Sequence, residues 1–94
     1  MALLPDLEIQ HALVDLNEWK RERNEICKVF EFPDFARAMG FVSSVALFAE
    51  HANHHPDINI RWNKVALTLS THSEGGITDK DIGLAEKIES LLQK

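Results

Sequence analysis

Three of the four histidines and two of the five carboxylates between positions 50 and 81 of this 94-residue chain have the residue types and spacing of a functional site. The carboxylates are Glu50 and Asp81, and the imidazoles belong to His54, His55 and His72. The histidines follow an apolar helical run and an alternating strand-like run, and such element ends are where folds keep binding and catalytic residues. We therefore treat these five residues as candidates for one functional site.

The spacing around the adjacent histidines predicts how their rings are presented. Glu50 and His54 are four residues apart on an expected helix, so they share one helical face and the carboxylate can orient or charge the imidazole. Pro56 cannot continue the helix and biases His55 toward an extended backbone. This corner can present two rings to one pocket, although histidines also suit a helix end simply by interacting with its carbonyls and dipole.

A zinc site built from His54, His55 and His72 is an alternative, since three imidazoles and a water form a known catalytic zinc arrangement. Adjacent histidines bind one ion poorly in most geometries, and these three histidines have neither the four-residue helical spacing of a zinc-binding pair nor cysteine ligands nearby. We therefore expect no metal and no other cofactor. His11 and His51 are expected at helix surfaces.

Hydrophobic periodicity predicts the elements that position these residues. We expect a helix from Asp6, its candidate cap, to about Asn17, and two strands joined by a turn near Asn24. A central helix with an apolar stripe from Phe35 to Ala52 should follow. A hairpin with a turn at Asn63-Lys64 and a final helix capped by Thr78 and Asp81 complete the order. This order predicts an α+β domain with a mainly antiparallel four-stranded sheet and helices covering one face.

The apolar surface of the central helix is wider than one sheet contact needs, because Phe41 and Phe48 flank its stripe. The excess predicts contact with another element or another subunit. If strand regularity persists to His72, its side chain faces away from the core and lines a surface or cleft. Considered alone, Trp62 is expected to be an aromatic side chain that packs within the hairpin.

Composition restricts the class of protein. Ninety-four residues with 45% hydrophobic content fit one domain over residues 1–94, with oligomerisation a plausible way to cover remaining apolar surface. A net charge of −5 argues against nucleic-acid binding, and the basic cluster at 20–23 is interrupted by an acidic residue. Cys27 cannot form an internal disulfide and is expected to be a small buried hydrophobe. No segment is long enough for a signal peptide or a membrane span, so a cytoplasmic protein is expected.

The motif around the histidines resembles the signature of the pterin-4a-carbinolamine dehydratase family, also described as dimerisation cofactors of a homeodomain transcription factor. The resemblance rests on Glu50, His54-His55-Pro56, Trp62, His72 and Asp81 at these spacings. It extends over most of the chain from Trp19 onward, through the segments 32–35, 45–50, 71–72 and 75–78. Ile58 departs from the family pattern at a position where an aromatic residue is frequent.

The resemblance implies an α+β fold with a four-stranded antiparallel sheet and three helices on one face, assembled into dimers or tetramers. It also implies dehydration of 4a-hydroxytetrahydrobiopterin to quinonoid dihydrobiopterin during tetrahydrobiopterin recycling, without a metal or redox cofactor. His54 and His72 would then be the acid/base pair, and His55 would bind the pterin and assist. Glu50 would orient His54 or bind the ring, Trp62 would wall the pocket, and Asp81 would hold the loop or pair with a histidine.

Two other interpretations stay open at this point. The family's transcription-cofactor role suggests a non-catalytic module that binds a partner protein through its helical faces. The same chemistry could instead act on another pterin, such as a relative of the molybdenum cofactor.

Overall fold

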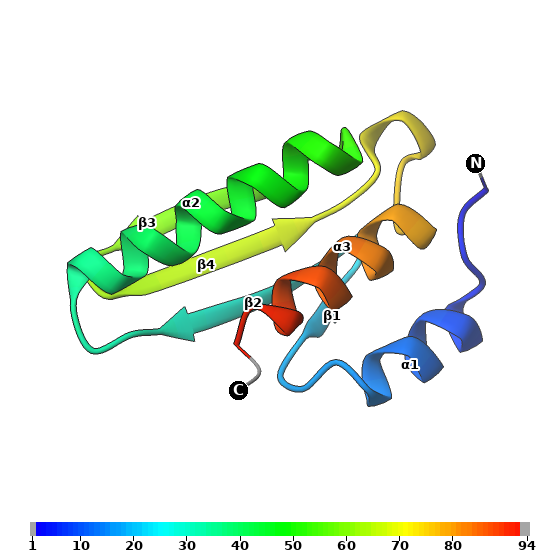
Figure 1. The fold of residues 1–94 in the computed structure, drawn as a ribbon. Helices are drawn as coiled ribbons and strands as arrows, with labels where there is room; N and C mark the ends of the chain where they lie inside the picture. Colours follow the sequence, from blue (N-terminus) through cyan, green and yellow to red (C-terminus); the bar gives the residue numbers. More distant parts are fainter. Residues whose placement is uncertain (1, 93–94) are drawn as a thin grey trace.

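Four antiparallel strands form one sheet in the order β1-β2-β4-β3 in the computed structural model, which describes residues 2–92 (Figure 1). The strands are β1 (Lys20–Glu22), β2 (Glu25–Glu31), β3 (Asp57–Arg61) and β4 (Lys64–Leu69). Along β2 and β4 the register aligns Ile26 with Leu69 and Phe30 with Val65, so apolar side chains of neighbouring strands share one face. The predicted four-stranded antiparallel sheet is confirmed.

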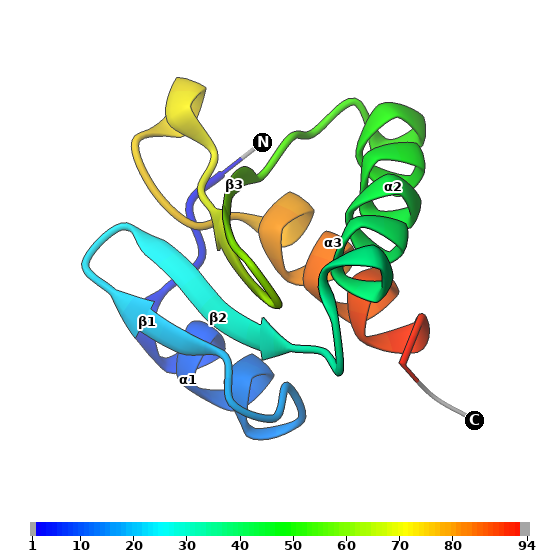
Figure 2. The ribbon, with the colours of Figure 1, turned by 90° about the vertical axis from the view of Figure 1, so that its left-hand side faces the viewer.

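Three α-helices cover one face of this sheet: α1 (Asp6–Val14), α2 (Phe35–Ala52) and α3 (Asp79–Ser90). Helices α2 and α3 pack against each other there (Figure 2), and a short 3-10 helix, η1 (His72–Glu74), leads from β4 toward α3. The predicted bounds of the central helix are confirmed. Helix α1 is shorter than predicted and is capped by Pro5, so Asp6 is its first residue rather than its cap.

The core lies between the sheet and the helices. Its fully buried side chains include Ile26, Val65 and Leu67 from the strands and Val45 and Ile88 from the helices. Burying a side chain of this size stabilises the folded state by about 1.5–3 kcal/mol. This layer fixes the ends of α2 and α3 relative to β4, where the candidate site residues lie.

Phe41 is predicted at the flank of the central helix, but the structure places it in the core. Its ring lies 4.8 Å from that of Phe30 and 4.9 Å from that of Phe32, and only 7% of the residue is exposed. The exposed apolar residues of α2 are instead Phe35, Met39 and Leu47. The prediction fails because the face of α2 that packs on the sheet includes Phe41. The ring of Phe41 packs there against Phe30 and Phe32.

Two smaller expectations are also wrong. The hairpin turn lies at Trp62-Asn63, since Arg61 pairs with Lys64 as the last residues of the ladder. Cys27 is only half-buried, because it points to the sheet face that the helices leave open. Among the helices within residues 2–92, none is long and apolar enough to cross a bilayer.

Candidate active site

The C-terminus of α2 turns the chain sharply and sets the direction of His54. Asn53 adopts a left-handed conformation (φ 51°), which asparagine tolerates better than most residues. The amide of His54 then donates to the carbonyl of Ala49 at 3.1 Å. The imidazole therefore leaves the helix end toward α3 instead of continuing along the face of α2.

His54 is paired with Asp81, the third residue of α3. Nε2 of His54 lies 2.6 Å from Oδ1 of Asp81, and both residues are buried. A carboxylate can only accept, so Nε2 of His54 donates in this bond, and in the neutral ring Nδ1 is then the acceptor atom. The resemblance implies that Asp81 holds a loop or pairs with a histidine, and the structure shows it pairing with His54.

The carboxylate of Asp81 is fixed from several directions. Its Oδ2 accepts hydrogen bonds of 2.8 Å from the hydroxyl of Thr71 and from the amide of Thr78. Thr78 is the N-cap of α3, and with Asp81 it forms a complete capping box. One buried carboxylate thus both starts a helix and orients an imidazole.

Thr71 is a site residue that the sequence patterns do not single out. Its hydroxyl lies 2.8 Å from that of Thr78, and its amide donates to the carbonyl of Gly76 at 2.7 Å. An isolated bridge pairs residues 71 and 76, so the segment that carries η1 closes into a tight loop. Its position beside His72 is the only sequence signal that could have indicated this role.

Glu50 hydrogen-bonds His55 rather than His54, through Oε2 and Nε2. The predicted pairing of Glu50 with His54 is wrong because the left-handed Asn53 turns His54 away from the face of α2. Both members of the observed pair are exposed, with 76% of the Glu50 side chain and 56% of the His55 side chain accessible. Solvent screens such a pair, so it orients His55 and adds little stability.

The three predicted histidines meet at one surface groove, which we call the histidine groove. His72 reaches it from η1, since β4 ends at Leu69 and the strand alternation expected for His72 does not continue. The groove has a volume of about 280 Å³. Its lining residues are Asn53, His54, His55, Ser70, Thr71, His72, Ser73 and Lys80.

Trp62 does not reach the histidine groove. It lies at the tip of the β3–β4 hairpin, is 68% exposed and has a positive φ of 53°. The five residues of β3 separate it from the histidine pair, and a strand of that length spans about 16 Å. Trp62 is therefore not among the lining residues of this groove, and its role as a wall of the substrate pocket stays a prediction.

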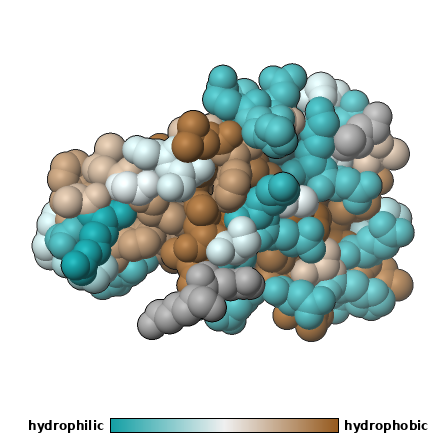
Figure 3. All heavy atoms as spheres, viewed as in Figure 1, coloured by the Kyte–Doolittle hydropathy of each residue, from teal (hydrophilic) through white to brown (hydrophobic). Residues whose placement is uncertain are grey.

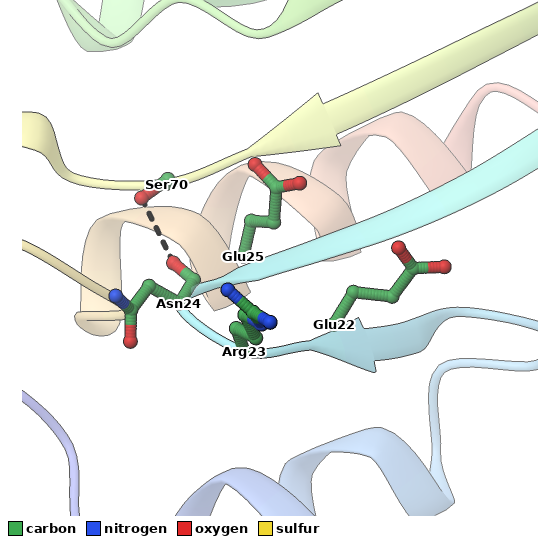
Figure 4. Close-up of a pocket in the computed structure, with 5 residues that line it drawn as sticks. All are labelled: Glu22, Arg23, Asn24, Glu25 and Ser70. Atoms are coloured by element: carbon green, nitrogen blue, oxygen red, sulfur yellow. Dashed lines mark hydrogen bonds between the residues drawn. The ribbon is translucent and has the colours of Figure 1, made fainter.

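A hollow at the β1–β2 turn is larger, with a volume of about 370 Å³. Figure 4 shows its lining residues Glu22, Arg23, Asn24, Glu25 and Ser70, and Ser70 donates a hydrogen bond to the carbonyl of Asn24. It contains no imidazole. The polar side chains of this hollow sit at an exposed turn, so we take the histidine groove as the candidate site.

The histidine groove contains one imidazole that is hydrogen-bonded to a buried carboxylate and another that is exposed. A carboxylate behind an imidazole fixes its tautomer and stabilises the imidazolium that forms when the ring accepts a proton, as in other histidine–carboxylate pairs. His72 is exposed, so it can exchange protons with solvent. The arrangement suits the removal of a proton and the protonation of a leaving group on one small molecule.

Comparison with known proteins assigns the chain to a family. The family model described as Pterin 4 alpha carbinolamine dehydratase matches residues 2–91. A relative from Roseiflexus castenholzii, which carries that enzyme's name provisionally, is 54% identical over 91 residues, covering 97% of this chain and 98% of the relative. The chain belongs to this family of hydro-lyases.

A second member of the pterin-4-alpha-carbinolamine dehydratase family, from Acidobacterium capsulatum, is 51% identical over 92 residues, covering 98% of this chain and all of the relative. A crystal structure from Brucella melitensis, described as a transcriptional coactivator/pterin dehydratase, has a TM-score of 0.92 at 38% identity and covers 97% of this chain and 99% of that one.

A more distant structure shares the fold alone. A pterin dehydratase-like protein described as a RuBisCO assembly factor of the alpha-carboxysome has a TM-score of 0.65 at 22% identity. It covers 78% of this chain and 84% of that one. A protein with the same architecture is therefore described as an assembly factor. Because a fold does not determine function, the function of this chain has to be argued from its site.

Proposed function

We propose that the chain dehydrates a 4a-hydroxytetrahydropterin to the quinonoid dihydropterin in the histidine groove. In this reaction the bond from C4a to its hydroxyl breaks, N5 loses its proton, and a double bond forms between C4a and N5. The departing hydroxyl takes up a proton and leaves as water. The bond between His54 and Asp81 is the observation that supports this proposal most strongly.

His54 is proposed as the base that removes the proton from N5. The positive charge that the ring gains is balanced by Asp81, whose second oxygen is held by Thr71 and Thr78. His72 is proposed as the acid that protonates the C4a hydroxyl. His55, oriented by Glu50, binds the pterin ring beside them. Each positioned proton transfer is typically worth ~10²–10⁴ in rate.

The physiological substrate proposed is 4a-hydroxytetrahydrobiopterin, the product of aromatic amino acid hydroxylases, and the role is tetrahydrobiopterin recycling. The names of the family and of its relatives support this choice. A direct assay follows the loss of the 4a-carbinolamine spectroscopically with purified protein. Because imidazole titrates near neutrality, the rate should depend on pH between about 5.5 and 8.

Variants of the two histidines test the proposed mechanism. His54→Ala and His72→Ala should each lower the dehydration rate by at least ~10² because each deletes a proton-transfer group. His51→Ala is the matched control, since His51 is exposed on α2 and does not line the groove. Full activity in both groove variants would refute the proposal, and circular dichroism checks that His54→Ala is still folded.

Self-association through the outer face of α2 is proposed as the second property of this chain. No charged residue occurs between Arg37 and Glu50, and the surface over α2 is mostly apolar or neutral (Figure 3). Gly40 lies within α2 although a Cβ at this position would meet nothing within 4 Å. A glycine inside a helix costs about 0.5–1 kcal/mol relative to alanine, and close approach by another helix would account for its presence.

The description of the Brucella structure also includes transcriptional coactivation. An apolar helix of a partner protein would pack on the same uncharged face. Such a helix and a second copy of the chain both require an apolar surface without charges. We propose a second copy as the occupant, because an uncharged apolar patch can pair with itself across a two-fold axis without any complementary charge.

A further inference from the structure

A second hollow adjoins the histidine groove, and we call it the α3 groove. It has a volume of about 200 Å³ and lies between the end of α2 and one face of α3. Its lining residues are Ala52, His54, Lys80, Gly83, Leu84 and Lys87. His54 and Lys80 also line the histidine groove, so the two hollows meet at these side chains.

The α3 groove has an apolar floor with a cationic side chain at each end. Lys80 and Lys87 are seven residues apart on α3, so they share a helix face and lie about 10.5 Å apart along its axis. Within residues 2–92, neither lysine forms an ion pair with a carboxylate. Two unneutralised ammonium groups beside this groove, in a chain of net charge −5, favour a ligand that carries an anionic group.

Gly83 keeps the middle of this groove open. It lies inside α3, and a Cβ at this position would meet nothing within 4 Å. Packing within the chain therefore does not require glycine here, although glycine costs about 0.5–1 kcal/mol relative to alanine inside a helix. The missing side chain instead leaves room on the helix surface between the two lysines.

The chemistry of the pterin ring connects the two grooves. C6 is bonded directly to N5, so a substituent on C6 begins one bond from the atom that His54 deprotonates in the proposed reaction. His54 forms part of the wall of both grooves. A ring placed with N5 at His54 can therefore direct its C6 substituent toward the entrance of the α3 groove.

We propose that the α3 groove binds the C6 side chain of the pterin and that Lys87, at the end of the groove that does not adjoin the histidine groove, selects a side chain carrying a phosphate group. This inference rests on the proposed dehydration chemistry and adds a second substrate class beside 4a-hydroxytetrahydrobiopterin, whose side chain is neutral: a 4a-hydroxytetrahydropterin with a phosphorylated C6 side chain. Lysine recognises a phosphate as a compact point charge, and each charge-assisted hydrogen bond is stronger than a neutral one.

Binding of three stable dihydropterins tests this inference. The probes are 7,8-dihydropterin without a C6 substituent, 7,8-dihydropterin with a trihydroxypropyl side chain, and the monophosphate of that second compound. Calorimetry on the full chain should show the phosphorylated compound binding about tenfold more tightly than its neutral parent, a difference worth about 1.4 kcal/mol. This advantage should shrink as salt is raised, because the lysines are exposed.

Variants test which residues give the phosphorylated compound its higher affinity. Lys87→Gln should bring the affinity ratio of the phosphorylated and neutral compounds close to one. The matched control Lys64→Gln removes the same charge from an exposed lysine on β4 that lines neither groove, and should leave the ratio as it is in the wild type. Gly83→Leu should weaken both side-chain-bearing compounds while leaving the unsubstituted ring unaffected.

The outcomes separate the two proposals. Equal affinity for the phosphorylated and neutral compounds, or a Lys87→Gln ratio equal to the wild-type ratio, would overturn the inference and leave the dehydratase proposal standing. Failure of all three pterins to bind would overturn both. Lys87-dependent binding by a chain that dehydrates none of the corresponding carbinolamines would support the α3 groove and refute the catalytic proposal.

Discussion

Asp81 lies 2.6 Å from His54 across 27 positions of sequence, and the same carboxylate completes the capping box of α3. The start of a helix and the orientation of a proposed base therefore depend on one buried side chain. Activity and stability therefore have to be measured together for variants of His54 and Asp81.

Asp81→Asn should lower both activity and stability. The amide cannot balance a charged His54 as a carboxylate does, so we expect the dehydration rate to fall by about 10–100-fold. The free energy of unfolding should fall by about 1–3 kcal/mol, because an amide has one acceptor oxygen where the carboxylate has two, so the buried donors on one side of residue 81 lose their acceptor. Enzyme assays and urea unfolding measure the two effects.

The matched control for that variant is Thr78→Ala, which removes the capping hydroxyl but keeps the carboxylate facing His54. It should cost about 1 kcal/mol of stability and reduce the rate much less. Equal losses of rate in both variants would show that Asp81 acts only through the helix cap.

Glu50→Gln should have small effects. The pair that Glu50 forms with His55 is exposed on both sides, so we expect a change in the free energy of unfolding of less than about 0.5 kcal/mol. The rate should fall by less than about tenfold, because His55 keeps its ring and loses only one orienting partner. A loss as large as that of His54→Ala would place Glu50 among the residues that act directly on the substrate.

Leu47→Glu should dissociate the oligomer without unfolding the chain. Leu47 is 73% exposed on the uncharged face of α2, where a carboxylate would be desolvated only if another subunit covers it. Sedimentation analysis should show a smaller species than the wild type. Ser43→Glu on the same face should act in the same direction, whereas an unchanged size for both variants would exclude this face as the interface.

Glu89→Ala should be strongly destabilising. Oε2 of Glu89 accepts hydrogen bonds from Nζ of Lys28 at 2.7 Å and from Nε1 of Trp19 at 3.0 Å, and joins the end of α3 to β2 and to the loop before β1. Only 9% of the Lys28 side chain is exposed. Its ammonium group would be left without its partner, and we expect a loss of about 3 kcal/mol in urea unfolding.

The double variant Lys28→Met with Glu89→Leu is the control for that prediction. It replaces both charges with apolar side chains of similar size, so it should recover most of the lost stability. A double variant as unstable as Glu89→Ala would show that the ion pair itself is required.

Cys27 should react slowly with alkylating reagents near neutral pH. Burial raises the pKa of its thiol, and the carboxylates of Glu22 and Glu25 raise it further. The thiolate is the reactive form, so iodoacetamide at about pH 8 should modify the folded protein more slowly than the urea-unfolded chain. Mass spectrometry follows the reaction, and equal rates in the two states would contradict this prediction.

The strands, the three helices and the set of histidines follow from local patterns in the sequence. Alternation along β2 and β4, the stripe of α2 and the cap at Thr78 are short-range signals, which explains why the α+β class and most element bounds were predictable. The histidine motif also indicated the groove, because its spacing places the rings at the ends of α2 and β4.

The pairing within the site was decided by the tertiary structure. A single left-handed residue, Asn53, redirects His54 from Glu50 to Asp81, and helical spacing contains no signal of that turn. Packing likewise moved Phe41 into the core, while the length of β3 separated Trp62 from the groove. Local sequence determines which residues are helical, extended or charged, whereas the contacts between distant segments depend on how the layers of side chains pack.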